Sequence, residues 1–456
     1  MNKLSPFFAS VVCCLHLSTF AQGVEPASKE ELEELKSVVE GERESAMEYR
    51  GYVDALRKIK ISGYMQTQFR LTDLNGGTAQ FSGGNFPANT NKMFQVRRAR
   101  LKIAYDNVLT QFVVELDAIQ TGVTMKDAYL SVIEPWTQSF GFQMGVFYRP
   151  FGYEMSFSSG SRETPEQSRM YQTLFPGERD LGVKLFYSPQ IGPFSFLRAE
   201  LGIFNGSGPA SNEFDNFKDV IGQVVTQFPL DELNAAVDLG LSGYLGNVRN
   251  ATKYLWTNGE SAPGTKGFVL DSSATNLGDG APRRYVGLDV QLYYDVPVLG
   301  GLVVRGEYIT GRQPGTSTAP TPAGPNGTSQ TTISPAAQAT GPVYQRDFAG
   351  WYVNLVQNIG NDNQVIVKYD VYDPNTFVTA TDFVSGNNLS VADIKYSTLG
   401  FGFIHHWDGN VKFVFYYEIP KNEKLTSSTI AGTSPLAPFV GDVKDNVFTF
   451  RVQYKF

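Results

Sequence analysis

Apolar and polar positions alternate strictly at the carboxyl end of the chain. Residues 447–456 read VFTFRVQYKF, so aromatic or apolar side chains occupy every second position up to Phe456. Because successive side chains of a strand point to opposite faces, one face of this segment is apolar and the other is mostly polar. A last strand of this kind is typical of a bacterial outer-membrane β-barrel. The alternative is the half-buried last strand of a soluble sheet.

The same alternation recurs from residue 58 onward and predicts about sixteen strands. They lie near residues 58–71, 93–106, 108–119, 123–134, 138–149, 180–188, 194–204, 218–229, 233–246, 281–296, 301–311, 343–357, 364–373, 393–407, 410–419 and 445–456. Every second connection is a tight turn, whereas the others are mostly long, with 247–280 and 315–338 the clearest. Short turns at one rim and long loops at the other predict an all-β fold, a transmembrane antiparallel β-barrel.

The charged face of each predicted strand is expected to face the barrel lumen. Arg98, Arg100 and Lys102 alternate with apolar residues in one strand, and Lys184 shares the inward face of another. An arginine facing lipid at mid-bilayer costs about 2–4 kcal/mol. A barrel of about sixteen strands is also too wide for side chains to fill. We therefore predict a water-filled pore.

Acidic residues lie on the neighbouring inward faces. They are Glu115, Asp117, Asp127 and Glu200. We expect these carboxylates to neutralise much of the positive field of the inward arginines and lysines.

Residues 22–57 have a different pattern, in which apolar residues recur at heptad spacing. The a and d positions are occupied by Leu32, Leu35, Val39, Ala46, Tyr49, Val53 and Leu56, and the remaining d position by the charged Glu42. Ser28 is the predicted N-cap, and Glu31 completes a capping box. The pattern favours a short periplasmic coiled coil that holds several barrels together. The alternative is a single amphipathic helix, which Gly41 and Gly51 would weaken.

The start of the chain predicts export. Residues 1–21 combine Lys3 with an apolar run and small residues before position 22, as in a secretory signal peptide. A lipoprotein signal at Cys13 or Cys14 is the weaker alternative, because the preceding residues are not small. Both cysteines of the chain lie in this segment, so disulfides and cysteine metal sites are excluded from the mature protein.

Composition excludes further classes. After the signal, no apolar run approaches the roughly 18 residues of a transmembrane helix, so a membrane protein of this sequence would have to be a barrel. The net charge of -7 argues against nucleic acid as a partner. The mature chain keeps only His405 and His406, on opposite faces of one predicted strand. We predict no enzymatic activity, no cofactor and no metal.

Four motifs carry a family resemblance. Residues 95–102 (QVRRARLK), 125–129 (MKDAY) and 145–152 (GVFYRPFG) are followed by 176–183 (PGERDLGV). In this order they resemble the phosphate-selective porin O and P family, over roughly residues 58 to 190. The resemblance implies a sixteen-stranded outer-membrane barrel, usually a homotrimer, that passes small anions or solutes by diffusion. It also implies that Phe456 is part of the signal read by the barrel-assembly machinery.

The connection 151–180 contains Arg162, Arg169 and Arg179 among Glu163, Glu166 and Glu178. Loops of this length are usually functional or disordered. One interpretation is a segment that folds into the barrel and presents arginines to anions as bidentate donors. The other is an extracellular loop whose charges pair with one another. The resemblance favours the first.

Together these patterns predict three regions: a signal peptide (1–21), a periplasmic helical segment (22–57) and an outer-membrane barrel (58–456). The predicted function is passive diffusion of small solutes and ions across the outer membrane of a Gram-negative type cell, in contact with its lipid. A mild anion preference that extends to phosphate is expected from the candidate pore residues Arg98, Arg100, Lys102, Arg162, Arg169, Arg179 and Lys184. A cation-preferring or general nutrient porin is the main alternative, ahead of an outer-membrane enzyme and a closed structural barrel.

Overall fold

The computed structural model describes residues 28–73, 86, 87, 89–209, 213, 215–262, 264–319, 341–426 and 430–456. The chain divides into two compact units, Met1–Arg57 and Lys58–Phe456. The predicted signal peptide lies outside the described residues and stays a prediction.

The first unit contains one long helix, α1 (Lys29–Arg57). Its N-terminus has the predicted capping box: Ser28 N–H donates to Glu31 Oε2 at 2.9 Å, and Glu31 N–H donates to Ser28 Oγ at 3.2 Å. No residue of α1 is buried, and the d-position Leu35 is 62% exposed. The apolar stripe of the helix is therefore not covered by any other residue that the structure describes. Among the helices described, none has the length and apolar character needed to cross a membrane.

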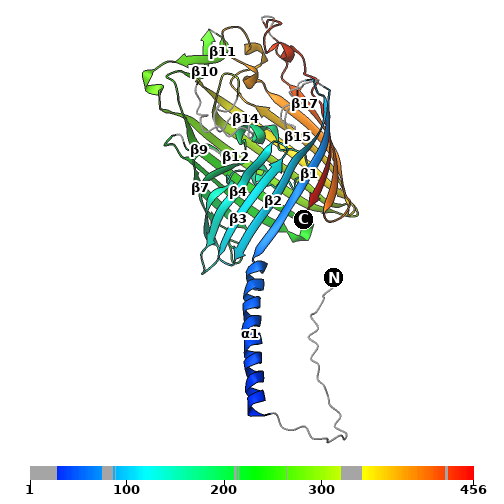
Figure 1. Cartoon of the computed structure of the whole chain (residues 1–456). Coiled ribbons are helices and arrows are strands. Elements are labelled where there is room, and N and C mark those ends of the chain that lie inside the picture. The colour runs from blue at the N-terminus through cyan, green and yellow to red at the C-terminus, as the bar shows by residue number, and fades with distance from the viewer. Residues whose placement is uncertain are drawn as a thin grey trace. The chain divides into compact units, whose positions relative to one another are not determined.

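The second unit is a closed antiparallel barrel (Figure 1). Within the described residues, sixteen strands form the wall. They are β1 (Ile59–Thr72), β2 (Lys92–Asn107), β3 (Thr110–Ile119), β4 (Gly122–Ile133), β5 (Phe140–Tyr148), β6 (Arg179–Tyr187), β7 (Leu197–Phe204), β8 (Asp219–Leu230), β9 (Ala235–Arg249), β12 (Gly280–Val296), β13 (Gly300–Gly315), β14 (Val343–Ile359), β15 (Asn363–Asp373), β16 (Tyr396–His406), β17 (Val411–Asn422) and β18 (Val447–Lys455). The last strand pairs with the first, with Phe69 opposite Phe450, and this pairing closes the predicted barrel.

Two further strands extend the sheet beyond the wall, β10 (Leu255–Ala262) and β11 (Thr265–Asp271). They form a hairpin whose first strand runs parallel to the start of β14, with Trp256 stacked on Tyr344 at 5.5 Å between ring centroids. The expectation that 247–280 is a loop is wrong at these residues. The glycines and proline of this stretch suggested turns, whereas Trp256 and Phe268 pack on Tyr344 and hold the hairpin in place.

Five short 3-10 helices lie in the described connections between strands. They are η1 (Asp231–Leu233), η2 (Ala274–Asn276), η3 (Ala380–Asp382), η4 (Val391–Asp393) and η5 (Ala437–Val440).

The outer face of the wall is apolar, as the alternation predicts. On β12, Val286, Leu288 and Val290 are each exposed, whereas Asp289 and Gln291 between and beside them are buried on the inner face. The exposed apolar side chains recur around the barrel, which is the pattern of a wall that faces lipid.

Part of the lumen is filled by an aromatic core. Between β5 and β6 the chain forms two short helices, α2 (Tyr153–Ser156) and α3 (Arg169–Leu174). Phe151, Tyr171 and Phe175 from this connection pack against Tyr244 and Tyr285 on the inner faces of β9 and β12. The sequence analysis placed charged side chains in the lumen and did not identify these aromatic ones. The inner faces here carry aromatic residues, which a folded segment of the chain covers.

Two glycines on the inner wall make room for this packing. A Cβ atom at Gly287 would lie 2.9 Å from the ring of Phe151, and one at Gly350 would lie 2.9 Å from Met170. Larger residues at either position would push the connection away from the wall.

Candidate permeation pathway

Residues 151–178, here called the inserted segment, are held against one side of the barrel by β9 and β13. The Gly152 N–H donates to Ser242 Oγ at 2.8 Å. The N–H groups of Tyr153 and Glu154 donate to the Glu307 carboxylate at 3.0 and 2.6 Å. The first turn of the segment is thereby fixed to the inner wall.

The middle of the inserted segment is held by β1 and β18. Gln66 Nε2 donates to the carbonyl oxygen of Ser159 at 2.8 Å, and Gln453 Nε2 donates to that of Gly160 at 2.8 Å. Arg451 Nη1 donates to the carbonyl oxygen of Pro165 at 2.8 Å. Because these strands and those of the first attachment lie apart in the strand order, the segment reaches across the lumen and narrows it.

A cluster of charges forms where the inserted segment meets β2 and β18. The Glu166 carboxylate accepts from Arg97 Nε at 2.9 Å, from Arg98 Nη2 at 2.7 Å and from Arg451 Nη2 at 3.0 Å. Burial alone would raise the pKa of Glu166, but the three guanidinium groups hold this pKa well below its usual value. We call these four residues the Glu166 cluster. It carries three positive charges and one negative charge.

A β-bulge explains how two successive arginines reach one carboxylate. The register of β1 and β2 shifts between Gln66 and Thr67, which pair with Arg98 and Val96, so Arg97 is the extra residue. A bulge re-aims a side chain that strict alternation would send to the other face. Arg97 therefore joins Arg98 on the lumen side.

Arg162 lies next to this cluster, within the inserted segment. Its side chain is 4% exposed, and none of its three guanidinium nitrogens makes a hydrogen bond to a described residue. Its carbonyl oxygen accepts from Lys412 Nζ of β17 at 3.1 Å. The neighbouring Glu163 pairs instead with Arg305 of β13 at 2.9 Å. Arg162 and Lys412 thus add positive charge beside the Glu166 cluster.

The other predicted arginines are compensated by acids. Arg100 pairs with Asp117 at 3.2 Å and with Glu115 at 3.3 Å. Arg179 was expected in the connection 151–180 but is the first residue of β6. It pairs with Asp127 at 2.8 Å and with Glu178 at 2.7 Å. These two arginines meet four carboxylates, so the neutralisation expected from the sequence is present at this part of the wall.

The remaining predicted residues have separate environments. Lys184 pairs with Glu200 at 2.7 Å. Arg169 is buried, and its guanidinium carbon lies 4.0 Å from the centre of the Tyr396 ring. Lys102 is half-buried and forms no ion pair with a described residue. The seven predicted residues therefore do not form one ladder, and only Arg98 and Arg162 belong to the positive region around Glu166.

Three contributors to this region were missed by the sequence analysis. Arg97 falls on the apolar face in a regular strand, and only the bulge turns it inward. Arg451 and Lys412 lie on the polar faces of their strands, so the alternation marks both as lumen-facing. It does not show that Glu166 and Arg162 lie opposite them.

Neither a metal centre nor a histidine pair is present in the part of the chain that the structure describes. No group of three or more acidic, histidine or cysteine side chains there is arranged to hold a metal ion. His405 Nδ1 lies 2.9 Å from Asn363 Oδ1, and His406 Nε2 lies 3.4 Å from Gln364 Oε1. The two rings contact different partners on the neighbouring strand, as adjacent strand residues do.

Comparison with known proteins gives a fold likeness. No protein-family model matches the chain, and no curated protein matches it. Among solved structures, OprB of Pseudomonas putida is 11% identical with a TM-score of 0.51, over 89% of this chain and 96% of that one. An anion-selective porin from Comamonas acidovorans is 12% identical with a TM-score of 0.49, over 87% of this chain and 99% of that one. The outer membrane channel DcaP of Acinetobacter baumannii is 12% identical with a TM-score of 0.48, over 87% of this chain and 97% of that one.

The likeness to OprB shows that the two chains share a barrel fold. At this level of identity it says nothing of substrate or selectivity.

Proposed function

We propose that this protein is an outer-membrane porin, through which small solutes and ions diffuse passively. The wall of sixteen strands with an apolar outer face supports this proposal, because a barrel of that size encloses more space than its own wall side chains fill. The inserted segment then acts as the constriction. Permeating solutes therefore pass the charged side chains at this constriction.

The proposed selectivity is a mild preference for anions, with inorganic phosphate among those that pass. The observation that carries it is the Glu166 cluster, where three arginines surround one carboxylate. Arg162 and Lys412 lie beside it and increase the positive charge. A narrow channel with low-dielectric walls focuses such a local field, so its effect on permeating ions exceeds that of the net charge of the chain.

A cation-preferring or general porin is the second candidate. It is favoured by the acids on the opposite side of the lumen, where Glu307, Asp289 and Asp370 lie on the inner faces of β13, β12 and β15. The Lys368 ammonium compensates Glu154 there at 2.6 Å. The two candidates differ in the sign of selectivity.

Export and assembly belong to the same proposal. Residues 1–21 direct the chain out of the cytoplasm, and the barrel-assembly machinery inserts it into the outer membrane. The exposed heptad stripe of α1 supports a coiled coil of three copies, which gives a homotrimer in the lipid.

The first test is conductance. The purified full-length protein, added to a planar lipid bilayer, should give stepwise currents. A folded preparation, shown to be heat-modifiable on a gel, that gives no current would refute the porin proposal and favour a closed barrel.

The variant Arg162→Gln tests the proposed anion preference without breaking an ion pair. Arg162→Gln removes a charge that has no hydrogen-bonded partner among the described residues, so the barrel should fold and lose part of its anion preference. Arg312→Gln is the matched control, because Arg312 is half-exposed and pairs with Asp347 away from the Glu166 cluster. Equal selectivity in the two variants would contradict the assignment of Arg162 to the pathway.

A further inference from the structure

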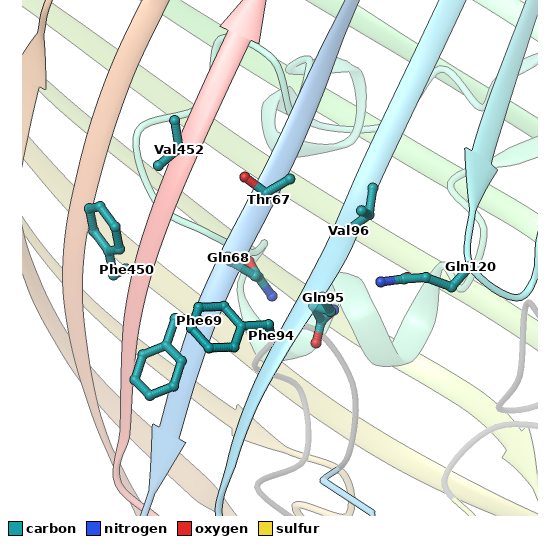
Figure 2. A pocket seen from close by; sticks show the side chains of 9 residues that line it. All are labelled: Thr67, Gln68, Phe69, Phe94, Gln95, Val96, Gln120, Phe450 and Val452. Carbon is teal, nitrogen blue, oxygen red and sulfur yellow. The ribbon is translucent and has the colours of Figure 1, made fainter.

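Aromatic side chains that are not fully buried occur both outside and inside the barrel. Phe69, Phe94 and Phe450 lie on the outer wall, where β18, β1 and β2 run side by side (Figure 2). Tyr153 and Phe157 belong to the inserted segment, and both are half-buried within the barrel. Rings within the lumen do not contact lipid, so another role must account for their exposure.

Tyr153 and Phe157 form one patch with a tyrosine of the wall. Their ring centroids lie 5.2 Å apart, and the ring planes are inclined at 32° to each other. The hydroxyl of Tyr153 hydrogen-bonds to that of Tyr293, near the end of β12. We call these three residues the lumen patch. Ser156 and Ser158, on either side of Phe157 in the chain, are exposed, so the patch is open to the lumen.

A buried cation lies against the lumen patch. The guanidinium carbon of Arg305 lies 4.7 Å from the centre of the Phe157 ring and 5.5 Å from that of Tyr153. Arg305 is 7% exposed and pairs with Glu163 at 2.9 Å. The face of an aromatic ring attracts cations, and Arg305 already satisfies this attraction. The exposed parts of the two rings therefore favour a planar group that is neutral or electron-rich.

Arg162 supplies an uncompensated cation close to the lumen patch. Its N–H donates to the Ser158 carbonyl oxygen at 2.9 Å, and this bond closes a turn after Phe157. The next residue, Glu163, reaches Arg305, which Phe157 also contacts, so the turn brings Arg162 back beside the patch. The three guanidinium nitrogens of Arg162 are buried without a hydrogen-bond partner among the described residues. Such a group points to an acceptor that the protein itself does not supply.

We propose that the constriction binds planar aromatic carboxylates, of which benzoate is the simplest, as they pass through the pore. The aromatic ring of the solute stacks on the lumen patch, and its carboxylate accepts from the Arg162 guanidinium as a bidentate partner. The proposal rests on the proposed porin function and names a class of solute for it. Inorganic phosphate can meet Arg162 but has no ring for the patch.

The test is a titration of the full-length protein, folded in detergent micelles, with sodium benzoate. Cyclohexanecarboxylate is the comparison ligand, because it has the same charge and a ring of six carbons that is puckered and cannot stack. Isothermal titration calorimetry should show benzoate binding at least about threefold more tightly. Equal affinities would show that the ring contributes only apolar area and would overturn the proposal.

Variants assign the ring and the carboxylate to their partners. Phe157→Leu keeps an apolar side chain but removes the ring, so it should abolish the preference for benzoate, whereas Phe157→Tyr should keep it. Phe401→Leu is the matched control, because Phe401 is 46% exposed on the outer face of β16. An unchanged preference in Phe157→Leu would contradict the role of the lumen patch.

Arg162→Gln should weaken the binding of both carboxylates to a similar extent, because it removes the charge and leaves the rings in place. Unchanged affinities in this variant would overturn the assignment of the carboxylate to Arg162. The titration needs no ion flow, so this proposal and the porin proposal fail separately. A protein that conducts potassium chloride but shows no preference for benzoate would overturn this proposal alone.

Discussion

Tyr171 donates its phenolic hydrogen to Glu307 at 2.5 Å, and this bond ties α3 of the inserted segment to strand β13. The same carboxylate accepts from the N–H groups of Tyr153 and Glu154 at 3.0 and 2.6 Å and from the hydroxyl of Tyr352 at 2.5 Å. One buried carboxylate therefore holds two distant parts of the segment against the wall. The width of the proposed pore depends on it.

Glu307→Gln should loosen the inserted segment. Glutamine keeps one acceptor oxygen and turns an NH₂ group toward donors, at a cost of about 2–3 kcal/mol. We expect a larger and noisier single-channel conductance in planar bilayers. Asp238→Asn on β9 is the control, because Asp238 accepts from Gln227 and not from the segment. A Glu307→Gln conductance equal to that of the unmodified protein would show that the segment is held by other contacts.

Glu166→Gln should increase the anion preference. The substitution leaves Arg97, Arg98 and Arg451 without their shared carboxylate, so the local positive charge rises by one. The readout is the reversal potential in a potassium chloride gradient, with Glu232→Gln in the exposed η1 turn as the control. A shift toward cations would contradict the assignment of this cluster to the pathway.

Acid should not reproduce the effect of Glu166→Gln. Because the pKa of Glu166 is depressed in the folded protein, its ion pairs stabilise the fold above the ordinary carboxyl pKa and are lost only as the pH falls through the lower, folded-state value. Lowering the pH from 7 to 5 therefore leaves Glu166 charged. The change in selectivity between pH 7 and pH 5 should therefore be the same in the unmodified protein and in Glu166→Gln; a larger change in the unmodified protein would show that Glu166 itself gains a proton in this range.

The apolar stripe of α1 should govern association. Leu35→Asp with Val39→Asp places charges at d and a positions and removes about 1.5–3 kcal/mol of burial per side chain in each helix. We expect smaller oligomers by mass photometry, with the barrel still folded. Ser37→Asp with Glu44→Asp changes the outer f positions and should have no effect. Unchanged oligomer size in the first variant would leave the barrel walls as the sole interface.

Deletion of Phe456 should impair assembly. The Phe456 N–H donates to the Gly63 carbonyl oxygen at 3.0 Å, and the Gly63 N–H donates back to the carbonyl of Phe456 at 3.0 Å, next to the seam between β18 and β1. We expect less heat-modifiable protein in the outer membrane after the deletion. Phe456→Tyr, which keeps an aromatic end, should assemble normally. Equal assembly of the deleted chain would remove Phe456 from the proposed signal.

The barrel could be predicted from sequence because its two faces meet different solvents. The proposed lipid outside selects residues such as Leu288 and Val290, and the interior accepts Asp289 and Gln291 between them, so a period of two is visible in β12. The capping box of Ser28 and Glu31 is a local signal of the same kind. The alternation of the strands and the capping box both depend only on residues that are close together in the sequence.

The arrangement of the lumen could not be predicted because it depends on contacts between distant residues. Glu166 meets Arg451 only when the inserted segment crosses the barrel. Arg97 turns inward only because β2 carries a bulge. The alternation places Tyr285 on the inner face of its strand. It does not show that Phe151 and Phe175 pack against this ring and form an aromatic core.

Reversal potential in a potassium chloride gradient tests the central claim most directly. The unmodified full-length protein is reconstituted in a neutral planar bilayer, with the higher salt concentration on one side. A pore whose field is set by the Glu166 cluster and Arg162 gives a potential of the sign that marks chloride as more permeant than potassium. A potential of the opposite sign would contradict the account and identify the acids beside Glu307 as the groups that control selectivity.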